Sequence, residues 1–272
     1  MGCYIERVVC EREVTHDAKE LIPDPAMRRR MSRVVKMGVM TAVECMGGVE
    51  HIDRLDTLVT ATGWGCLADS ERFLRTLIVE REQLLNPTPF IQSTFNTVGG
   101  QVALLRHNHC YNVTYVHRGH SFEDALLDAR LRMLDGDGKE VLVGAFDEQT
   151  PSQHRIMGRM GLFRRVQDGE GAVFVKLTTT QRDGVVAELT TLDFPTEPLD
   201  ETSCRARYAT TDRTALVWND YAEAGCYPTA SAHAFARAVR MLSAEVPEVV
   251  VYHSYMGSTP TVIVVRWVGS LV

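Results

Sequence analysis

The 272 residues of this chain suffice for one large domain or two small ones, and 45% of them are hydrophobic, which is ample for a buried core. A formal net charge of −6 argues against bulk electrostatic attraction to nucleic acid or to an anionic membrane. The seven cysteines are scattered and include no Cys-x-x-Cys pair, which is typical of a reducing compartment rather than of a disulfide framework or a structural zinc site.

Targeting and membrane signals are also missing from the sequence. The chain reaches charge at Glu6 and Arg7, so it begins without the apolar segment of a secretory signal. Residue 6 is also the wrong type for the N-myristoylation motif that Gly2 suggests. The longest apolar run, near 262–265, stops at Arg266, far short of a bilayer span. We therefore expect a soluble, cytoplasmic protein with no membrane insertion and no nucleic-acid partner.

The first two-thirds of the chain alternate between patterns typical of helices and of strands. Asp69 and Ser70 can cap one of the helices, and the prolines of 86–89 end it. In chain order, the predicted elements are helix 28–46, strand 56–61, a capped helix reaching residue 85, helix 97–105, strand 112–116, helix 121–134 and strand 140–146. This order predicts a mainly parallel sheet flanked by helices.

The last third is richer in strand patterns. Strands are predicted over 172–177 and 185–192, and again over 249–252 and 261–267, with one helix over 229–244 between the two pairs. Residues 194–212 carry prolines and many Thr, Glu and Asp side chains, which indicates an exposed connector.

The turn between strand 112–116 and helix 121–134 is the most informative feature. A strand that enters a helix through a sharp turn can aim one side chain at a substrate, while the helix N-terminus supplies positive potential. The turn here is His117-Arg-Gly-His120, and Gly119 occupies its tip. Because glycine has no side chain, the position where a reactive group is expected carries none. An ordinary loop glycine is the alternative interpretation.

Several motifs resemble those of the β-ketoacyl-acyl-carrier-protein synthases, and more narrowly their shorter bacterial ketoacyl-synthase-like relatives found beside polyene and lipid-type biosynthesis. The second motif departs from the subfamily's pattern at Phe95, which replaces a histidine. The motifs are RRRMSR (28–33), NPTPFIQSTFNT (86–97), VLVGAFDE (141–148), GEGAVF (169–174), YPTASA (227–232) and YHSY (252–255).

The resemblance implies an α/β fold, a thiolase-like layered αβαβα sandwich that is shortened in the second half. It implies one ketoacyl-synthase-like domain over 1–272, with a well-matched half at 1–178 and an abbreviated half at 179–272. Because the family associates through its sheet edges, a homodimer or a heterodimer is also implied.

The resemblance further implies that the catalytic positions are vacated. Counting forward from Gln101 and backward from Gly144 places the family's nucleophilic cysteine at Gly119. A condensing enzyme needs a thiolate to hold the acyl chain, which glycine cannot supply. Of the family's two histidines, one has no counterpart here, and Cys226 stands where the other belongs. A non-condensing pseudoenzyme of fatty-acid or polyene-type polyketide biosynthesis, comparable to a chain-length factor, is the expected function.

The implied partners are an acyl carrier protein and a cysteine-bearing ketoacyl synthase. The resemblance implies an acyl-binding site formed by Phe95, Asn96, Arg118 and Tyr227. It also implies that an acidic carrier protein could dock on a basic helix face, which consists of Arg28, Arg29, Arg30, Arg33 and Lys36. A solvated helix face is the plainer explanation of the basic residues.

Two other functions remain open. Residues 119–123 half-match a Gly-x-Ser-x-Gly elbow, so Ser121 could be the nucleophile of an acyl-thioester hydrolase or transferase. The candidate bases are His117, His120, His233 and His253, with Asp220 as a supporting carboxylate. A helix-capping role is the plainer explanation of the serine. The third possibility is a degenerate structural subunit with no acyl pocket.

No metal or cofactor is expected. The pair His107 and His109, followed by Cys110, lacks an accompanying carboxylate. The run 135–138 resembles a calcium loop but leads directly into a strand, and 62–65 is far from a dinucleotide-binding pattern.

Overall fold

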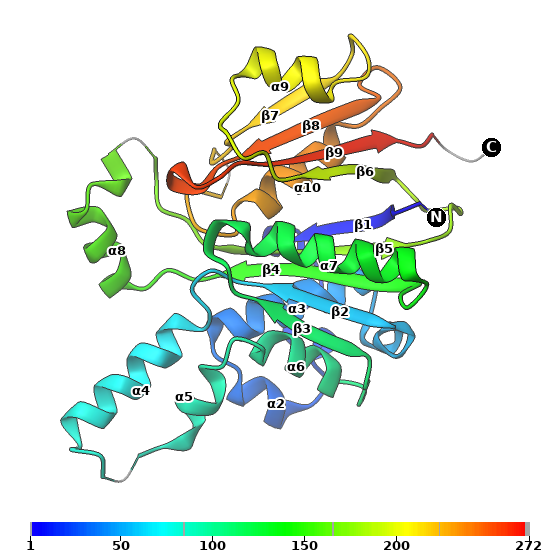
Figure 1. Ribbon diagram of the computed structural model, residues 1–272. Helices are drawn as coiled ribbons and strands as arrows, with labels where there is room; N and C mark the ends of the chain where they lie inside the picture. The colour runs from blue at the N-terminus through cyan, green and yellow to red at the C-terminus, as the bar shows by residue number, and fades with distance from the viewer. Residues whose placement is uncertain (1, 84, 165, 223, 270–272) are drawn as a thin grey trace.

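The computed structural model describes residues 2–83, 85–164, 166–222 and 224–269. Within these ranges, nine strands form one sheet in the order β3-β2-β4-β5-β1-β6-β9-β8-β7 (Figure 1). The strands are β1 (Tyr4–Cys10), β2 (Thr57–Ala61), β3 (Tyr111–Tyr115), β4 (Glu140–Asp147), β5 (Gly171–Thr178), β6 (Ala187–Asp193), β7 (Ala215–Trp218), β8 (Glu248–His253) and β9 (Thr261–Trp267).

Helices connect most of these strands, and short polar side chains begin several of them. Asp24, Asn86, Thr150 and Asp200 each accept a backbone N–H of the helix that follows, which is the usual N-cap role of these residue types. The helices are α1 (Ala18–Leu21), α2 (Pro25–Arg30), α3 (Arg33–Met46), α4 (Leu67–Val79), α5 (Pro87–Gln92), α6 (Thr97–Leu104), α7 (Ser121–Asp135), α8 (Pro151–Arg159), α9 (Glu201–Tyr208) and α10 (Ser231–Met241).

The sheet consists of two halves that meet at a short seam. β1 and β6 pair only through Tyr4 with Glu188 and Ile5 with Ala187. The first half runs β3-β2-β4-β5-β1, and the second half, read from its own edge, runs β7-β8-β9-β6. In both halves a parallel pair is followed by two antiparallel pairings. The second half therefore repeats the first without a counterpart of the edge strand β3.

The prediction of a mainly parallel sheet is wrong. Only three pairings are parallel, namely β2 with β3, β2 with β4 and β7 with β8, and the other five are antiparallel. The antiparallel neighbours include β1, which the pattern did not predict, and β9, which returns beside β8 after a loop with no crossover helix. Alternation of strands and helices indicates parallel pairing only where a crossover helix joins neighbouring strands.

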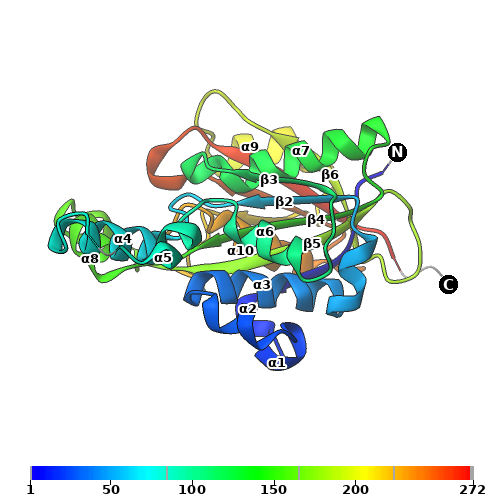
Figure 2. The same ribbon diagram turned by 90° about the horizontal axis from the view of Figure 1, so that it is seen from below.

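Side chains alternate between the two faces of each strand, and this alternation builds the layers. In β4, Val141 and Val143 belong to the central hydrophobic cluster, whereas Leu142 belongs to an outer cluster with α3. The central cluster contains α7 and α10, and a third cluster joins α9 to the outer face of the second half. The five layers are thus α3 with α6, the first half-sheet, α7 with α10, the second half-sheet, and α9. Figure 2 shows α3 and α7 on opposite sides of the first half-sheet.

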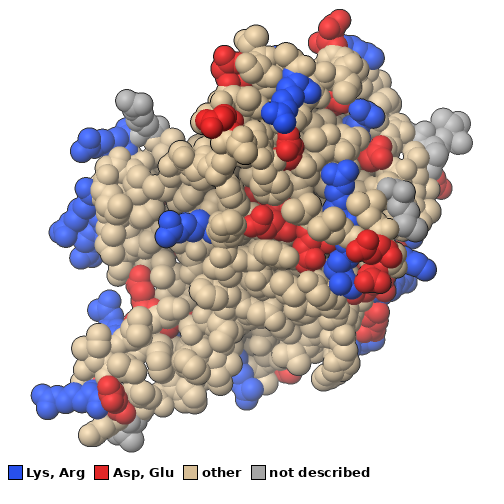
Figure 3. All heavy atoms as spheres, in the orientation of Figure 1, with Lys and Arg blue, Asp and Glu red and all other residues tan. Residues whose placement is uncertain are grey.

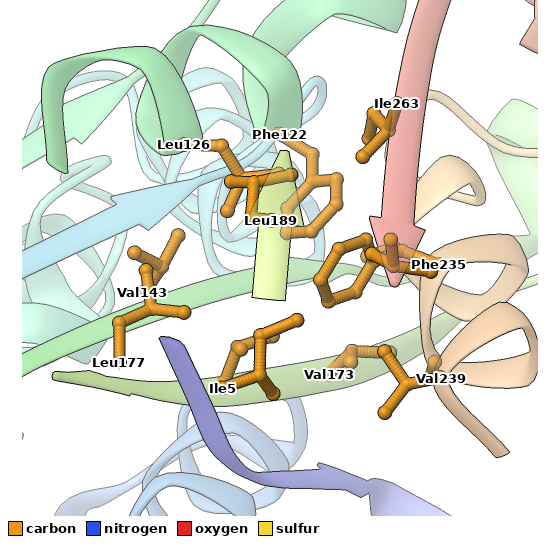
Figure 4. Packing of buried hydrophobic residues seen from close by; sticks show 14 of the residues in the cluster. Ile5, Phe122, Leu126, Val143, Val173, Leu177, Leu189, Phe235, Val239 and Ile263 are labelled. Carbon is orange, nitrogen blue, oxygen red and sulfur yellow. The ribbon is translucent and has the colours of Figure 1, made fainter. Parts of the chain in front are cut away.

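The two central helices meet through their aromatic side chains. Phe122 of α7 and Phe235 of α10 are fully buried, and their rings meet edge to face with centroids 5.7 Å apart. Ile5, Val173 and Ile263 belong to the same cluster and surround this contact (Figure 4). Burial of such side chains is the main stabilising term for a layered fold, so the centre of the molecule holds the two halves together.

Other element boundaries depart from the sequence-based ones. The predicted helix 28–46 is two helices, because α2 ends at Arg30 and the chain extends through Met31 and Ser32 before α3. α4 starts at Leu67, ahead of the expected cap. α5, α8 and, inside the supposed exposed connector, α9 were not predicted. α4, α5 and α8 project away from the sheet (Figure 1).

Candidate functional site

The predicted elbow forms at the end of β3. A short 3₁₀ turn, Arg118–His120, leads directly into α7, and Arg118 has a φ of +50°, a left-handed conformation that is strained for a residue with a side chain. Gly119 is buried at this turn. A Cβ atom added to Gly119 would lie 2.4 Å from Cβ of Tyr255, so the ring of Tyr255 covers the space that a side chain at this apex would need.

Ser121 stabilises the elbow rather than facing a substrate. Its Oγ accepts the backbone N–H of His117 at 2.7 Å and donates to the carbonyl of Arg118 at 2.8 Å. The residue is fully buried. Both hydrogen bonds are typical of a side chain that closes a turn at a helix start.

The imidazoles of the elbow are engaged elsewhere. His117 Nδ1 lies 2.8 Å from a carboxylate oxygen of Asp124, and His120 Nε2 lies 2.7 Å from the carbonyl of Thr259. Neither ring has a described hydrogen bond to Ser121. The serine and histidines that the sequence places together are therefore close in space without forming a nucleophile–base pair.

His253 lies at the carboxyl end of β8 and is almost completely buried. Burial lowers its pKa to about 4, with electrostatic interaction with His120 acting in the same direction and that with Asp220 acting in the opposite one. Neither ring nitrogen has a hydrogen-bond partner among the described residues. The edge of its ring packs against Tyr221, with centroids 5.4 Å apart. His253 is thus a neutral buried imidazole. Asp220 is bound by Arg237 at 2.5 Å.

Sequence reasoning missed Glu123, the most unusual group beside the elbow. This carboxylate is completely buried on α7, where burial raises its pKa to about 7. One oxygen accepts the hydroxyl of Thr261 at 3.0 Å, while the other has no partner. The hydroxyl of Ser231, like that of Thr261, lowers the pKa of Glu123 against the effect of burial. The sequence signal that could have predicted this buried carboxylate is the position of Glu123 among the apolar residues of helix α7.

Asp147, at the carboxyl end of β4, ties three segments together. Its carboxylate accepts the backbone N–H groups of Gly63, Trp64 and Thr229 and the hydroxyls of Thr62 and Thr229, at 2.8 to 3.2 Å. Burial raises its pKa to about 6, against the lowering effect of these donors. The loop after β2 and the loop before α10 are therefore fixed to the same buried carboxylate. The position of Asp147 at the end of an apolar strand is the sequence signal that could have predicted a functional or structural role for it.

The loop before α10 carries the position expected for the lost histidine. Cys226 is buried, and burial raises the pKa of its thiol to about 11. Its backbone N–H donates to the carbonyl of Gln167, so this loop packs on the segment before the GEGA motif. Tyr255, which packs on Gly119, also interacts electrostatically with the thiol of Cys226.

Tyr227 belongs to a different buried network. Its hydroxyl lies 2.5 Å from Nδ1 of His233, whose Nε2 lies 3.0 Å from a carboxylate oxygen of Glu11. Burial opposes protonation of His233, but its interactions with Cys10 and Glu11 outweigh burial and raise its pKa to about 9. His233 is therefore a charged structural imidazole and no base for Ser121.

The remaining predicted residues lie apart from this cluster. Phe95 is half exposed and packs on Gly65, and Asn96 accepts the hydroxyl of Thr114 at 2.8 Å. In the basic face, Arg28 donates to the carbonyl of Pro23 at 2.9 Å, and Arg33 forms an ion pair with Glu170. These two arginines already have partners within the chain.

Across the described ranges, no group of three His, Cys, Asp or Glu side chains is arranged to hold a metal ion. No described helix combines the length and apolar character needed to cross a bilayer.

A known family matches the part of the chain that contains the elbow. The model of the family "Beta-ketoacyl synthase, N-terminal domain" matches residues 10–166, more than half of the chain. The chain belongs to the β-ketoacyl synthase family. No curated protein matches the sequence.

Solved structures similar to this chain share its fold at low sequence identity. The ishigamide ketosynthase/chain length factor has a TM-score of 0.71 at 16% identity, covering 99% of this chain and 100% of that chain. A β-ketoacyl synthase from Burkholderia phymatum has a TM-score of 0.74 at 13% identity, covering 98% and 100%. A type II polyketide synthase acyl-carrier protein in complex with its ketosynthase has a TM-score of 0.69 at 13% identity, covering 98% and 99%. The predicted thiolase-like layered fold is confirmed, and the chain is ketosynthase-like.

Proposed function

We propose that this protein is a non-condensing, chain-length-factor-like subunit of a fatty-acid or polyene-type polyketide synthase. The proposal rests on what occupies the apex of the elbow. A nucleophile at position 119 is absent, and Tyr255 covers the space where its side chain would stand. Acyl transfer to a thiol requires an accessible thiolate at this point.

The surrounding groups support the same proposal. Cys226 is a buried thiol whose raised pKa keeps it protonated, so it is a poor replacement nucleophile. His253 is neutral, and none of the described residues forms a hydrogen bond with its ring that could orient it as a base. We therefore assign Gly119 and Cys226 as vacated catalytic positions.

We propose that a cysteine-bearing ketosynthase is the partner, with a homodimer as the alternative assembly. β3 has only β2 as a neighbour, so its outer edge can pair with a strand of another chain. Val116, directly after β3, and Phe95 are large apolar side chains that are 41% and 50% exposed. One of the similar structures is itself a ketosynthase/chain length factor.

The acyl carrier protein is the second proposed partner. Because Arg28 and Arg33 are engaged, the free members of the predicted docking face are fewer than the sequence suggested. Basic side chains also gather over α8 (Figure 3), where Arg155 and Arg159 line a surface cavity of about 820 Å³. Asp168, which lines this cavity, forms an isolated β-bridge with Cys226. The arginines of α8 therefore offer an acidic partner a basic surface close to the proposed vacated position at Cys226.

The hydrolase alternative has less support. Ser121 is buried, and its hydroxyl is used by two backbone hydrogen bonds. His117, His120, His233 and His253 are engaged elsewhere or have no hydrogen bond that would orient them toward it. We also propose that the chain forms one domain, with its abbreviated half after residue 178, and that it works in the cytoplasm.

Acylation measured on both chains tests the proposal. The protein is co-expressed with the cysteine-bearing ketosynthase of its own gene neighbourhood, and the pair is incubated with an acyl-carrier thioester. Intact-mass spectrometry should show an acyl adduct on the synthase and none on this chain. Carrier binding should weaken in Arg155→Glu/Arg159→Glu and much less in Arg29→Glu/Arg30→Glu.

An acyl adduct on this chain would contradict the proposal. Cys226→Ala and Ser121→Ala then identify the nucleophile, since the adduct disappears only in the variant that removes it. Failure of the two chains to co-purify, together with full synthase activity without this chain, would instead favour the degenerate structural subunit.

A further inference from the structure

A groove between α2 and α5–α6 is the most distinctive surface that the proposed function does not use. It consists of two adjoining cavities of about 350 and 500 Å³ that share Arg30, Thr88 and Gln92 as their common wall. Cavities of this size are typical of small-molecule sites. The two compartments differ in chemistry, so the groove has a polar end and an apolar end.

The polar compartment is strongly basic. Arg29, Arg30 and Arg72 line it, and Asp69 is the acidic residue among its lining residues. The local balance is thus positive on a chain whose formal net charge is −6. Arg29, Arg30 and Arg72 are exposed, and no hydrogen bond or ion pair of their side chains is described. Such a cavity concentrates anions against the field of the whole protein.

A buried polar side chain without a partner among the described residues lines the same compartment. Gln92 is 5% exposed, and its Oε1 has no described hydrogen bond. Ser32 precedes α3 without capping it, and its hydroxyl interacts with the carboxylate of Asp69, whose pKa burial raises and Ser32 lowers. Native proteins rarely leave buried polar atoms unpaired, so a ligand or ordered water is expected here.

The α3 N-terminus adds a favourable field for an anion. α3 runs from Arg33 to Met46, and its first N–H groups lie beside Ser32, which lines the cavity. A helix of this length carries a partial positive charge at its start. The side-chain amide of Gln92 can rotate to present its N–H₂ group, so the compartment offers several donors at once.

The second compartment is lined by aliphatic side chains. Met27, Ile91 and Leu104 face it, together with Gln101 and His107 at the polar margin. Ile91 and Leu104 are 58% and 52% exposed, which leaves a sizeable apolar surface to be covered. Arg30 stands at the junction of the two compartments.

We propose that this groove binds an alkyl phosphate, with the phosphate in the basic compartment and the chain over Met27, Ile91 and Leu104. Three guanidinium groups and the Gln92 amide offer more donors than the two oxygens of a carboxylate can accept. A phosphate presents a third anionic oxygen and fits the forked guanidinium geometry. The site is separate from the elbow and does not depend on the proposed non-condensing role.

Binding of octyl phosphate below its micellar concentration, measured by isothermal titration calorimetry on the full chain, tests the proposal. We expect saturable binding that is at least tenfold weaker in Arg29→Gln/Arg72→Gln. Arg75→Gln removes an exposed arginine of α4 that does not line the groove, and it should bind like the unchanged protein. Ile91→Ser/Leu104→Ser should bring the affinity for octyl phosphate close to that for inorganic phosphate.

A second arm distinguishes the source of the ligand. Co-sedimentation with phosphatidylcholine vesicles containing phosphatidic acid, lost in Arg29→Gln/Arg72→Gln, would assign a membrane lipid. Binding of octyl phosphate alone would assign a soluble ester. The proposal is overturned if neither probe binds, or if the affinity is unchanged in the double arginine variant while its melting temperature matches that of Arg75→Gln.

Discussion

The two halves of the sheet share a strand order but differ at the point where function is expected. In the first half, β2 leads through α4–α6 to the edge strand β3 and then to the elbow before α7. In the second half, β7 is followed by residues 219–222 and 224–230 and then by α10, and none of these described residues forms a strand equivalent to β3. This shorter loop folds back on the first half, where Asp147 binds Thr229. The loop before α10 is thus fixed to the first half by a buried carboxylate, while Tyr255, after β8, covers the apex of the elbow.

The contact that joins the halves should give the largest effect when it is broken. Phe235→Ala removes a fully buried ring of α10 that packs on Phe122, so we expect a loss of ~3–5 kcal/mol in the free energy of unfolding. Urea denaturation measures it. Leu131→Ala on α7 removes a side chain that is 51% exposed and should cost much less. A similar loss for both would mean that the central layer does not hold the halves together.

The carboxylate that fixes both loops should have the next largest effect. Asp147→Ala leaves the buried donors of Gly63, Trp64 and Thr229 without their acceptor, and we expect a loss of ~2–4 kcal/mol. Thermal unfolding followed by circular dichroism measures it. Asp53→Ala breaks the half-exposed ion pair with Arg106 and should cost under about 1 kcal/mol. Equal melting temperatures for the two variants would refute the role of Asp147.

The buried carboxylate of Glu123, on the central helix α7, should make the stability of the protein depend on pH. Its folded pKa of about 7 lies above the ordinary glutamate pKa of 4.5, so the folded state binds more protons than the unfolded state between these pH values. Stability therefore falls as pH rises from about 4.5 to about 7, by at most ~3 kcal/mol. Glu123→Gln should raise the melting temperature at pH 8 and change it little at pH 4.5. A stabilisation that is the same at both pH values would contradict this assignment.

The vacated apex should give the smallest effect. Gly119→Cys places a Cβ against Tyr255, and we expect a loss of ~1–3 kcal/mol from overpacking. Gly119→Cys/Tyr255→Gly should lose less than the sum of the two single variants, because Tyr255→Gly removes both the Cβ atom and the ring that the new side chain would meet. A double-mutant cycle in urea measures this coupling. Strict additivity would show that Tyr255 does not limit the apex.

The sequence by itself determined the family, the elbow and most of the strands. Near-continuous apolar runs predicted β4, β8 and β9 within a residue or two, because strands that are buried on both faces need apolar side chains on both. The position of Gly119 followed from motifs that flank it on both sides. The break at Met31, the helix α9 and the antiparallel pairings did not follow, because each depends on distant partners.

Only the tertiary structure decided which polar groups lie together. Tyr255 over Gly119, Glu123 against Thr261, and Asp147 between two loops join residues more than 80 positions apart in the chain. Burial, which sets the pKa of Glu123 and His253, exists only when the layers are closed. Local sequence patterns determine which residues face inward, whereas the chemistry of an inward-facing group depends on the residues that surround it.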